Sequence, residues 1–183
     1  MRVGKLLIAN PILPRTSPWS KRVIYIFADD EIQGTRGLIV NHPTRYSITE
    51  FVAGRGWDMP LSREFIRVGG PVNSKVLFML HTNEWHSSST AQVGNSLAIS
   101  CDEFMLEKMG FGDQPNLWRM ALGMCSWAPG QLDMEINGDP PYNRSNSWLV
   151  ADADTNILFE YDSEKQWKEA LELSSKQTID SWF

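Results

Sequence analysis

The chain has 183 residues, of which 42% are hydrophobic and 21% are charged, a balance that excludes an intrinsically disordered chain. The length suffices for one domain with a sizeable core, so we expect residues 1–183 to form a single domain. The formal net charge of −5 argues against direct binding of DNA or RNA, because contacts to phosphates need a basic surface.

The two cysteines, Cys101 and Cys125, are too few for a disulfide framework. We expect both thiols to be buried as small apolar side chains in a reducing compartment. The apolar run at residues 6–9 is interrupted at once by Asn10 and Pro11, and no run in the sequence is long enough to cross a bilayer. The sequence therefore predicts a cytoplasmic protein with no membrane partner.

The N-terminal part of the chain begins with a strand at residues 3–9, which gives way to an ordered, proline-containing loop at residues 10–20. Three cations lie in or just after this loop: Arg15, Lys21 and Arg22. They are a candidate small basic patch, and an ordinary solvated surface is the alternative interpretation.

Short apolar runs between turn residues predict most of the remaining elements to be strands. These strands are expected at residues 22–28, 37–41, 76–81, 97–99, 117–125, 148–151 and 157–161. A polar turn joins the first two into a hairpin, and the turn at residues 152–156 predicts a second hairpin between the last two.

Capping residues predict the helices. Ser47 with Glu50 forms a capping box for a helix through residue 52, and Ser100 with Glu103 forms one for a helix through Met109. A final helix is expected to open with Ser163 and Gln166, to bury Trp167, Ala170 and Leu171, and to lead into a tail whose Ile179, Trp182 and Phe183 pack against the body.

Two segments lack these patterns. Residues 82–94 are polar and are expected to be a mobile surface loop, and residues 138–147 read as a loop rich in Pro, Asn and Ser. Strands outnumber helices and alternate with them irregularly. The expected fold class is therefore α+β, a single compact domain with a mainly antiparallel, barrel-like sheet.

The stretch at residues 123–136 contains a strand, a sharp turn at Pro129 and Gly130, and a short helix that ends at Asn137-Gly138. Backbone N–H groups at the start of such a helix can hold an anion. A packing corner plugged by Trp127 is the interpretation that we favour over an anion site.

The residues that could carry chemistry are scattered. No pair of histidines or cysteines has metal-ligand spacing, so no metal site and no cofactor are expected. Cys125 becomes a candidate nucleophile only if His81 or His42 lies within hydrogen-bond reach, and a buried, unreactive thiol is the commoner case.

Several motifs, taken in order, resemble the YqgE/AlgH family over nearly the whole chain. They are residues 4–11 (GKLLIANP), 37–44 (GLIVNHPT), 69–72 (GGPV), 80–81 (LH) and 127–133 (WAPGQLD), with Ser100, Asp102 and Phe104 at a helix start and residues 147–150 and 157–159 near the C-terminus. The chain departs from the family pattern at His42, where the family has arginine, and at Pro129.

The resemblance implies a flattened, barrel-like sheet flanked by a few helices, and it implies no particular reaction. Some family members are called transcriptional regulators. We therefore expect a non-enzymatic binding or regulatory protein that acts through a protein or small-molecule partner; a small enzyme that uses Cys125 or His81 is the alternative. The candidate binding surface joins three groups of turns, if they meet at one end of the sheet: Asn41, His42 and Pro43; Gly69, Gly70 and Pro71 with His81; and Trp127, Gly130 and Gln131.

Overall fold

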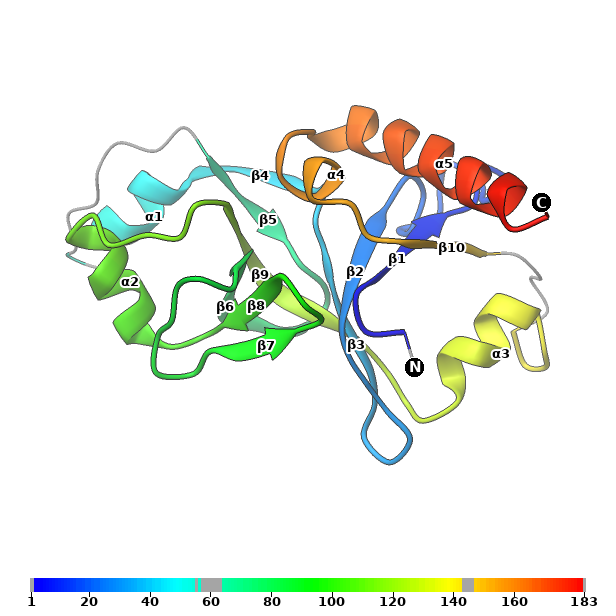
Figure 1. Cartoon of the computed structure of the whole chain (residues 1–183), viewed down its shortest axis with the longest axis horizontal. Coiled ribbons are helices and arrows are strands. Elements are labelled where there is room, and N and C mark those ends of the chain that lie inside the picture. The colour runs from blue at the N-terminus through cyan, green and yellow to red at the C-terminus, as the bar shows by residue number, and fades with distance from the viewer. Residues whose placement is uncertain (1, 55, 57–63, 143–146, 183) are drawn as a thin grey trace.

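The computed structural model describes residues 2–54, 56, 64–142 and 147–182. Within them the strands form one ten-stranded sheet (Figure 1). They are β1 (Lys5–Ala9), β2 (Val23–Asp30), β3 (Gly34–Ile39), β4 (Pro43–Ser47), β5 (Phe65–Val68), β6 (Val72–Thr82), β7 (Ala91–Val93), β8 (Leu97–Ser100), β9 (Trp118–Trp127) and β10 (Trp148–Asp152).

The sheet follows the order β10-β1-β2-β3-β9-β6-β8-β7, and β4 and β5 form a side branch that joins it at β9. The β5–β9 pairing is parallel, whereas the other pairings between described strands are antiparallel. The sheet curls into a half-barrel, so the predicted α+β fold with a mainly antiparallel, barrel-like sheet is confirmed. Strand β9 is central because it pairs with β3, β5 and β6.

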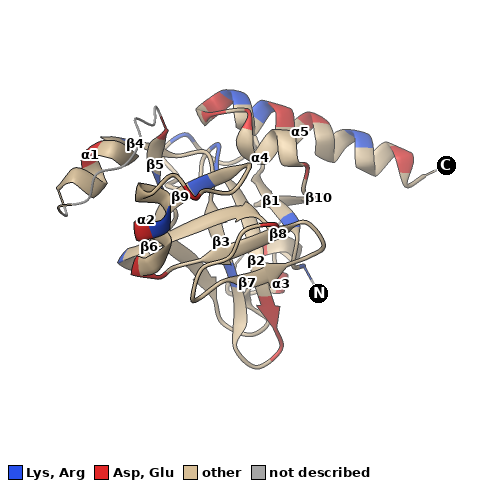
Figure 2. Cartoon of the chain, turned by 60° about the vertical axis from the view of Figure 1, so that its left-hand side comes forward, with Lys and Arg blue, Asp and Glu red and all other residues tan. Residues whose placement is uncertain are grey.

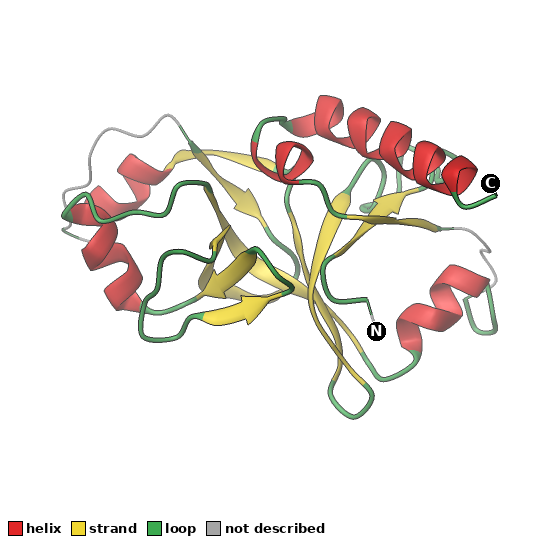
Figure 3. Ribbon diagram, viewed as in Figure 1, coloured by secondary structure: helices red, strands yellow, loops and turns green. Residues whose placement is uncertain are grey.

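The described helices lie around the outside of the sheet, as Figure 3 shows. They are α1 (Ile48–Ala53), α2 (Glu103–Gly110), α3 (Gln131–Asn137), α4 (Thr155–Phe159) and α5 (Ser163–Asp180). The capping box of Ser47 and Glu50 is present at α1 as predicted. Helix α3 is bounded by Gly130 and Gly138, which both have a φ of 73° that suits glycine.

Three local predictions were wrong. Residues 157–161 are not a strand, because Asp154 accepts hydrogen bonds from the N–H groups of Asn156 and Ile157 and begins α4 there. The N-cap of α2 is Asp102 and not Ser100, whose side chain is buried. The expected loop at residues 82–94 contains strand β7, and its serines bind the Asp102 carboxylate.

The C-terminal helix also differs in detail from the prediction. Trp167 and Ala170 are buried as expected, but Ser163 and Gln166 form no capping box, because Gln166 points into the core. Ile179 and Trp182 are 53% and 75% exposed and do not pack against the body; Phe183 lies outside the described residues. Acidic and basic side chains are interspersed along α5 (Figure 2).

The core consists of three apolar clusters. The largest lies between the sheet and α4 and α5, the second lies beneath α1 and α2, and the third lies beside α3. Cys125 is buried in the third cluster as expected, whereas Cys101 is exposed, contrary to the prediction. None of the helices in the described ranges is long and apolar enough to cross a membrane.

Candidate functional site

A hollow of about 490 Å³ opens where the end of β3, the start of β2 and the first residues of α5 meet. Its lining residues are Arg15, Ser17, Ser20, Lys21, Arg22, Asn41, His42, Pro43, Ser163 and Glu164. The volume lies in the range of small-molecule sites. The hollow thus joins the first group of predicted surface residues to the three cations that the sequence marked as a candidate basic patch.

Asn41 holds this corner together. Its Oδ1 accepts a hydrogen bond from the Val23 N–H at 2.9 Å, and its Nδ2 donates to the backbone oxygens of Lys21 at 2.7 Å and Ser163 at 3.0 Å. The residue is only 2% exposed. Because both ends of the amide are engaged, Asn41 positions the backbone of the hollow rather than offering a group to a ligand.

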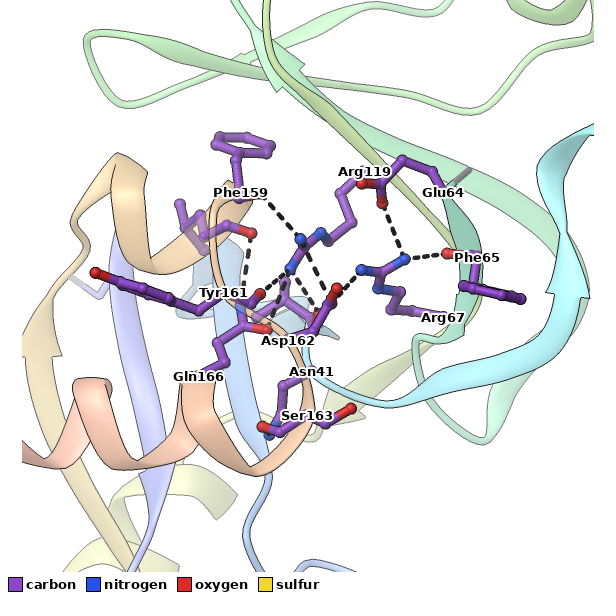
Figure 4. A network of polar contacts seen from close by, with 12 residues as sticks. Asn41, Glu64, Phe65, Arg67, Arg119, Phe159, Tyr161, Asp162, Ser163 and Gln166 are labelled. Atoms are coloured by element: carbon purple, nitrogen blue, oxygen red, sulfur yellow. Dashed lines mark hydrogen bonds and ion pairs between the residues drawn. The ribbon is translucent and has the colours of Figure 1, made fainter. Parts of the chain in front are cut away.

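A second layer behind Asn41 contains two buried arginines (Figure 4). Arg119 donates from Nη1 to Gln166 Oε1 at 3.1 Å and to the Tyr161 oxygen at 3.0 Å, and from Nη2 to the Phe159 oxygen at 3.1 Å. This fork of donors therefore fastens the turn between α4 and α5 to β9.

Asp162 is the counter-ion of this layer. Its carboxylate forms an ion pair with Arg67, and it lies 3.6 Å from Arg119 Nη2. Burial and the neighbouring Arg67 lower the pKa of Arg119 to about 10, so Arg119 is still charged at neutral pH. The first residues of α5, which line the hollow, are thereby held in one place.

The hollow carries more positive than negative charge. Lys21 forms an ion pair with Glu164 at 2.9 Å, whereas Arg15 and the partly buried Arg22 have no carboxylate partner among the described residues. Burial, and secondarily the charge of Arg22, lowers the pKa of His42. His42 is therefore neutral at neutral pH and the two unpaired guanidinium groups give the hollow its charge.

The second predicted group lies beside this site but does not line it. The His42 oxygen accepts a hydrogen bond from the Val68 N–H at 2.8 Å, and the Gly69 oxygen accepts one from the Ile39 N–H at 2.9 Å. Gly69 and Gly70 are buried against β9, and Pro71 is exposed. These turns allow a close crossing of backbones rather than forming a ligand site.

The structure does not gather all ten predicted residues on one surface. His81 is fully buried. Its ring nitrogens lie 2.8 Å from the Thr82 oxygen and 2.9 Å from Ser100 Oγ, so neither is open to a ligand. Trp127 pairs with Thr35 near the start of β3, whereas Asn41 follows the end of that strand, and Gly130 and Gln131 continue from Trp127 into α3. The length of β3 therefore separates the first and third groups.

Trp127 is 4% exposed and donates from Nε1 to Glu135 Oε2 at 3.1 Å, as the packing-corner interpretation predicts. Cys125 Sγ faces the Gly69 oxygen at 3.6 Å, and burial, with a smaller contribution from the charge of Glu135, raises the pKa of this thiol to about 12. Within the described ranges, no group of three or more His, Cys, Asp or Glu side chains is placed to hold a metal ion.

Comparison with known proteins identifies the chain's relatives. A family model described as AlgH-like matches residues 6–178. The chain belongs to the AlgH-like family. This confirms the resemblance to the YqgE/AlgH family that the motifs indicated.

The AlgH-like relatives match over most of their length. A UPF0301 protein of Gluconobacter oxydans is 34% identical over 171 residues, covering 92% of this chain and 88% of the relative. Another, from Xanthomonas oryzae pv. oryzae, is 31% identical over 170 residues, covering 91% and 86%.

Two solved structures are similar to this AlgH-like chain. The solution structure of the AlgH protein from Pseudomonas aeruginosa matches with a TM-score of 0.75 and 28% identity, covering 93% of this chain and 87% of that one. A crystal structure of a Corynebacterium diphtheriae protein has a TM-score of 0.69 at 20% identity, covering 92% and 85%, and shows the fold alone.

Sequence reasoning missed the second layer of this AlgH-like site. Arg67 and Arg119 each lie in an otherwise apolar strand. A charged side chain at such a position indicates a buried cation that needs a partner. Their partners Asp162 and Gln166 lie in a distant part of the sequence. The pairing therefore depends on the tertiary structure.

Proposed function

We propose that this AlgH-like protein acts by binding a small molecule that carries a carboxylate or phosphate group, and that the hollow beside Asn41 is the binding site. A regulatory role exerted through a protein or small-molecule partner in the cytoplasm is part of this proposal. The observation that carries it is the partly buried Arg22 guanidinium, which has no carboxylate partner among the described residues and lines a hollow of about 490 Å³.

The chemistry of the hollow favours an anion. A guanidinium group presents a planar fork of N–H donors that matches a carboxylate or phosphate. Arg15 adds a second charge from the loop, and the hydroxyl groups of Ser17 and Ser20 can donate further hydrogen bonds. The backbone around Arg22 is held by Asn41, so little ordering is needed when the anion binds.

The proposal is tested by titrating isotope-labelled protein with inorganic phosphate and with citrate while the amide NMR signals are followed. Saturable shifts are expected at residues 20–22, 41–42 and 163–164. Arg22→Gln should weaken binding at least fivefold, because the cation that pairs with the anion is lost. Lys176→Gln, an exposed site on α5, is the matched control and should bind like the unmodified protein. Equal weakening in both variants, or no saturable shift, contradicts the proposal.

The affinity of the same hollow for anions should depend on pH through His42. An anion favours the protonated form of His42, so binding is coupled to proton uptake by that ring. Because phosphate and citrate are themselves protonated as the pH falls, the comparison is with His42→Asn: at low pH the unmodified protein should bind these anions more tightly than the variant, and at pH 8 the two should bind alike.

The alternative function, an enzyme that uses the Cys125 thiol, is tested by alkylation of the native protein. Because Cys125 is buried and its thiol pKa is raised to about 12, iodoacetamide should modify Cys101 and leave Cys125 unmodified in the native protein near neutral pH. Modification of Cys125 at the rate of Cys101 would favour the enzyme. Direct DNA binding is a third possible function, and a gel shift at moderate salt tests it. Preferential retardation of a promoter fragment would support DNA binding.

A further inference from the structure

A second hollow, of about 500 Å³, lies between the loop after β1, helix α3 and the start of β10. Aromatic rings provide much of its lining: Trp19, Tyr142 and Trp148. The Trp19 and Trp148 rings meet edge to face, with centroids 5.8 Å apart and an angle of 67° between their planes. The hollow is therefore an apolar corner that presents aromatic surfaces in different orientations.

Among the described residues that line this hollow, Glu135 is the charged one. Its Oε2 accepts hydrogen bonds from the indole N–H groups of Trp127 and Trp148, both at 3.1 Å, and its Oε1 accepts one from Gln131 Nε2 at 3.0 Å. These donors fix the position of the carboxylate but are all neutral. No lysine or arginine within the described ranges pairs with Glu135, so its negative charge is not compensated there.

We propose that this second hollow binds a small organic cation that carries a methylated ammonium group. Aromatic faces attract such cations through the ring quadrupole, and they also favour contact with methyl groups. Glu135 supplies the opposite charge, which argues against a neutral or anionic occupant. An unmethylated ammonium or guanidinium group would require more hydrogen-bond acceptors than one carboxylate, already occupied by three donors, provides.

The probes are tetramethylammonium and choline, with 3,3-dimethylbutan-1-ol as a neutral molecule of the same shape as choline. Binding is followed by the NMR signals of the indole N–H groups of Trp127 and Trp148 and by isothermal titration calorimetry. Choline is expected to bind saturably and at least five times more tightly than the neutral alcohol. A short peptide with trimethyllysine forms a further arm, which distinguishes a free cation from a protein side chain as the source of the same group.

Two variants test the two halves of the proposal. Glu135→Gln should weaken choline binding at least fivefold and leave binding of the neutral alcohol unchanged. Trp19→Leu, which retains Glu135 and its three hydrogen bonds, should weaken choline binding at least threefold. Trp182→Leu is the matched control, because that indole is 75% exposed and distant in sequence from the hollow's lining residues.

The proposal is overturned if choline shows no saturable binding, if the neutral alcohol binds equally well, or if Trp19→Leu and Trp182→Leu behave alike. Arg22→Gln, which alters only the hollow beside Asn41, should leave choline binding unchanged. The failure of either site can thus be distinguished from the failure of the other.

Discussion

Asn41 donates a hydrogen bond to the backbone oxygen of Ser163 at 3.0 Å, although 122 positions separate the two residues in the sequence. This contact joins the end of β3 to the first residue of α5. The same side chain holds Lys21 and Val23 through two further hydrogen bonds. One amide group therefore connects three segments that line the proposed anion site.

Replacing Asn41 with alanine should lower the free energy of unfolding by about 3 kcal/mol, because three largely buried hydrogen bonds of about 1 kcal/mol each are lost. Urea denaturation measures the change. Asn95→Ala is the control, since Asn95 is exposed and should change stability by less than about 0.5 kcal/mol. Similar losses in the two variants would show that the Asn41 side chain does not hold this corner.

Asp162→Asn should also destabilise the protein, because Arg67 and Arg119 remain charged and buried after their shared counter-ion is removed. The loss should be about 2 kcal/mol, which is less than for a fully buried ion pair because the Asp162 side chain is 55% exposed. Asp180→Asn at the far end of α5 is a control in thermal or urea denaturation. A stability unchanged from the unmodified protein would contradict the assignment of Asp162 as counter-ion.

Gly69→Ala should destabilise the protein by about 3 kcal/mol, because the added Cβ would meet the Gly123 backbone oxygen and come within 2.9 Å of Ala121 Cβ. Gly54→Ala is a matched control at a helix end, where the nearest atom lies 3.5 Å away. The control should change the midpoint of urea denaturation only slightly. If the two variants had equal midpoints, the close crossing at Gly69 would be refuted.

The stability of the protein should fall as the pH decreases below about 6.5. Burial lowers the pKa of His81 in the folded state, so the unfolded state binds more protons in this range and acid favours unfolding. The Thr82 oxygen can only accept, so Nδ1 carries the hydrogen and Nε2 accepts from Ser100.

His81→Gln provides the comparison. The variant retains His42, whose pKa is also lowered, so the difference between the two stability profiles isolates His81. Between pH 7.5 and 5.5, urea denaturation should show a shallower loss of stability in the variant. Parallel profiles would mean that His81 does not contribute to acid sensitivity.

The parts of the fold predicted well are those that depend on local pattern. Apolar runs between turns located most of the strands, and the Ser47–Glu50 capping box located α1. The run at residues 157–159 was misassigned because three apolar residues fit either a strand or a helix. The Asp154 N-cap favours the helix α4 over a strand, and it is a local signal that the prediction of a strand does not take into account.

The candidate site depends on contacts that local patterns do not contain. The segment at residues 41–43 and the basic group of Arg15, Lys21 and Arg22 were each noted in the sequence, but nothing local indicated that they share a hollow. Their meeting depends on Asn41 and Ser163, and on the α4–α5 turn held by Arg119. The sequence places His81 on the candidate surface and Ser100 in a helix cap, whereas the structure buries the two side chains together.

The counter-ion of two buried arginines is encoded far downstream of both: 95 positions separate Arg67 from Asp162. Strand β1 likewise pairs with β10, which lies near the other end of the chain. During synthesis on the ribosome, β1 gains its β10 partner, and Arg119 gains its acceptors at Phe159, Tyr161 and Gln166, only after almost the whole polypeptide has emerged. Native structure in this protein is therefore completed after translation of the C-terminal segment, and a nascent chain that ends before residue 162 cannot close its interior.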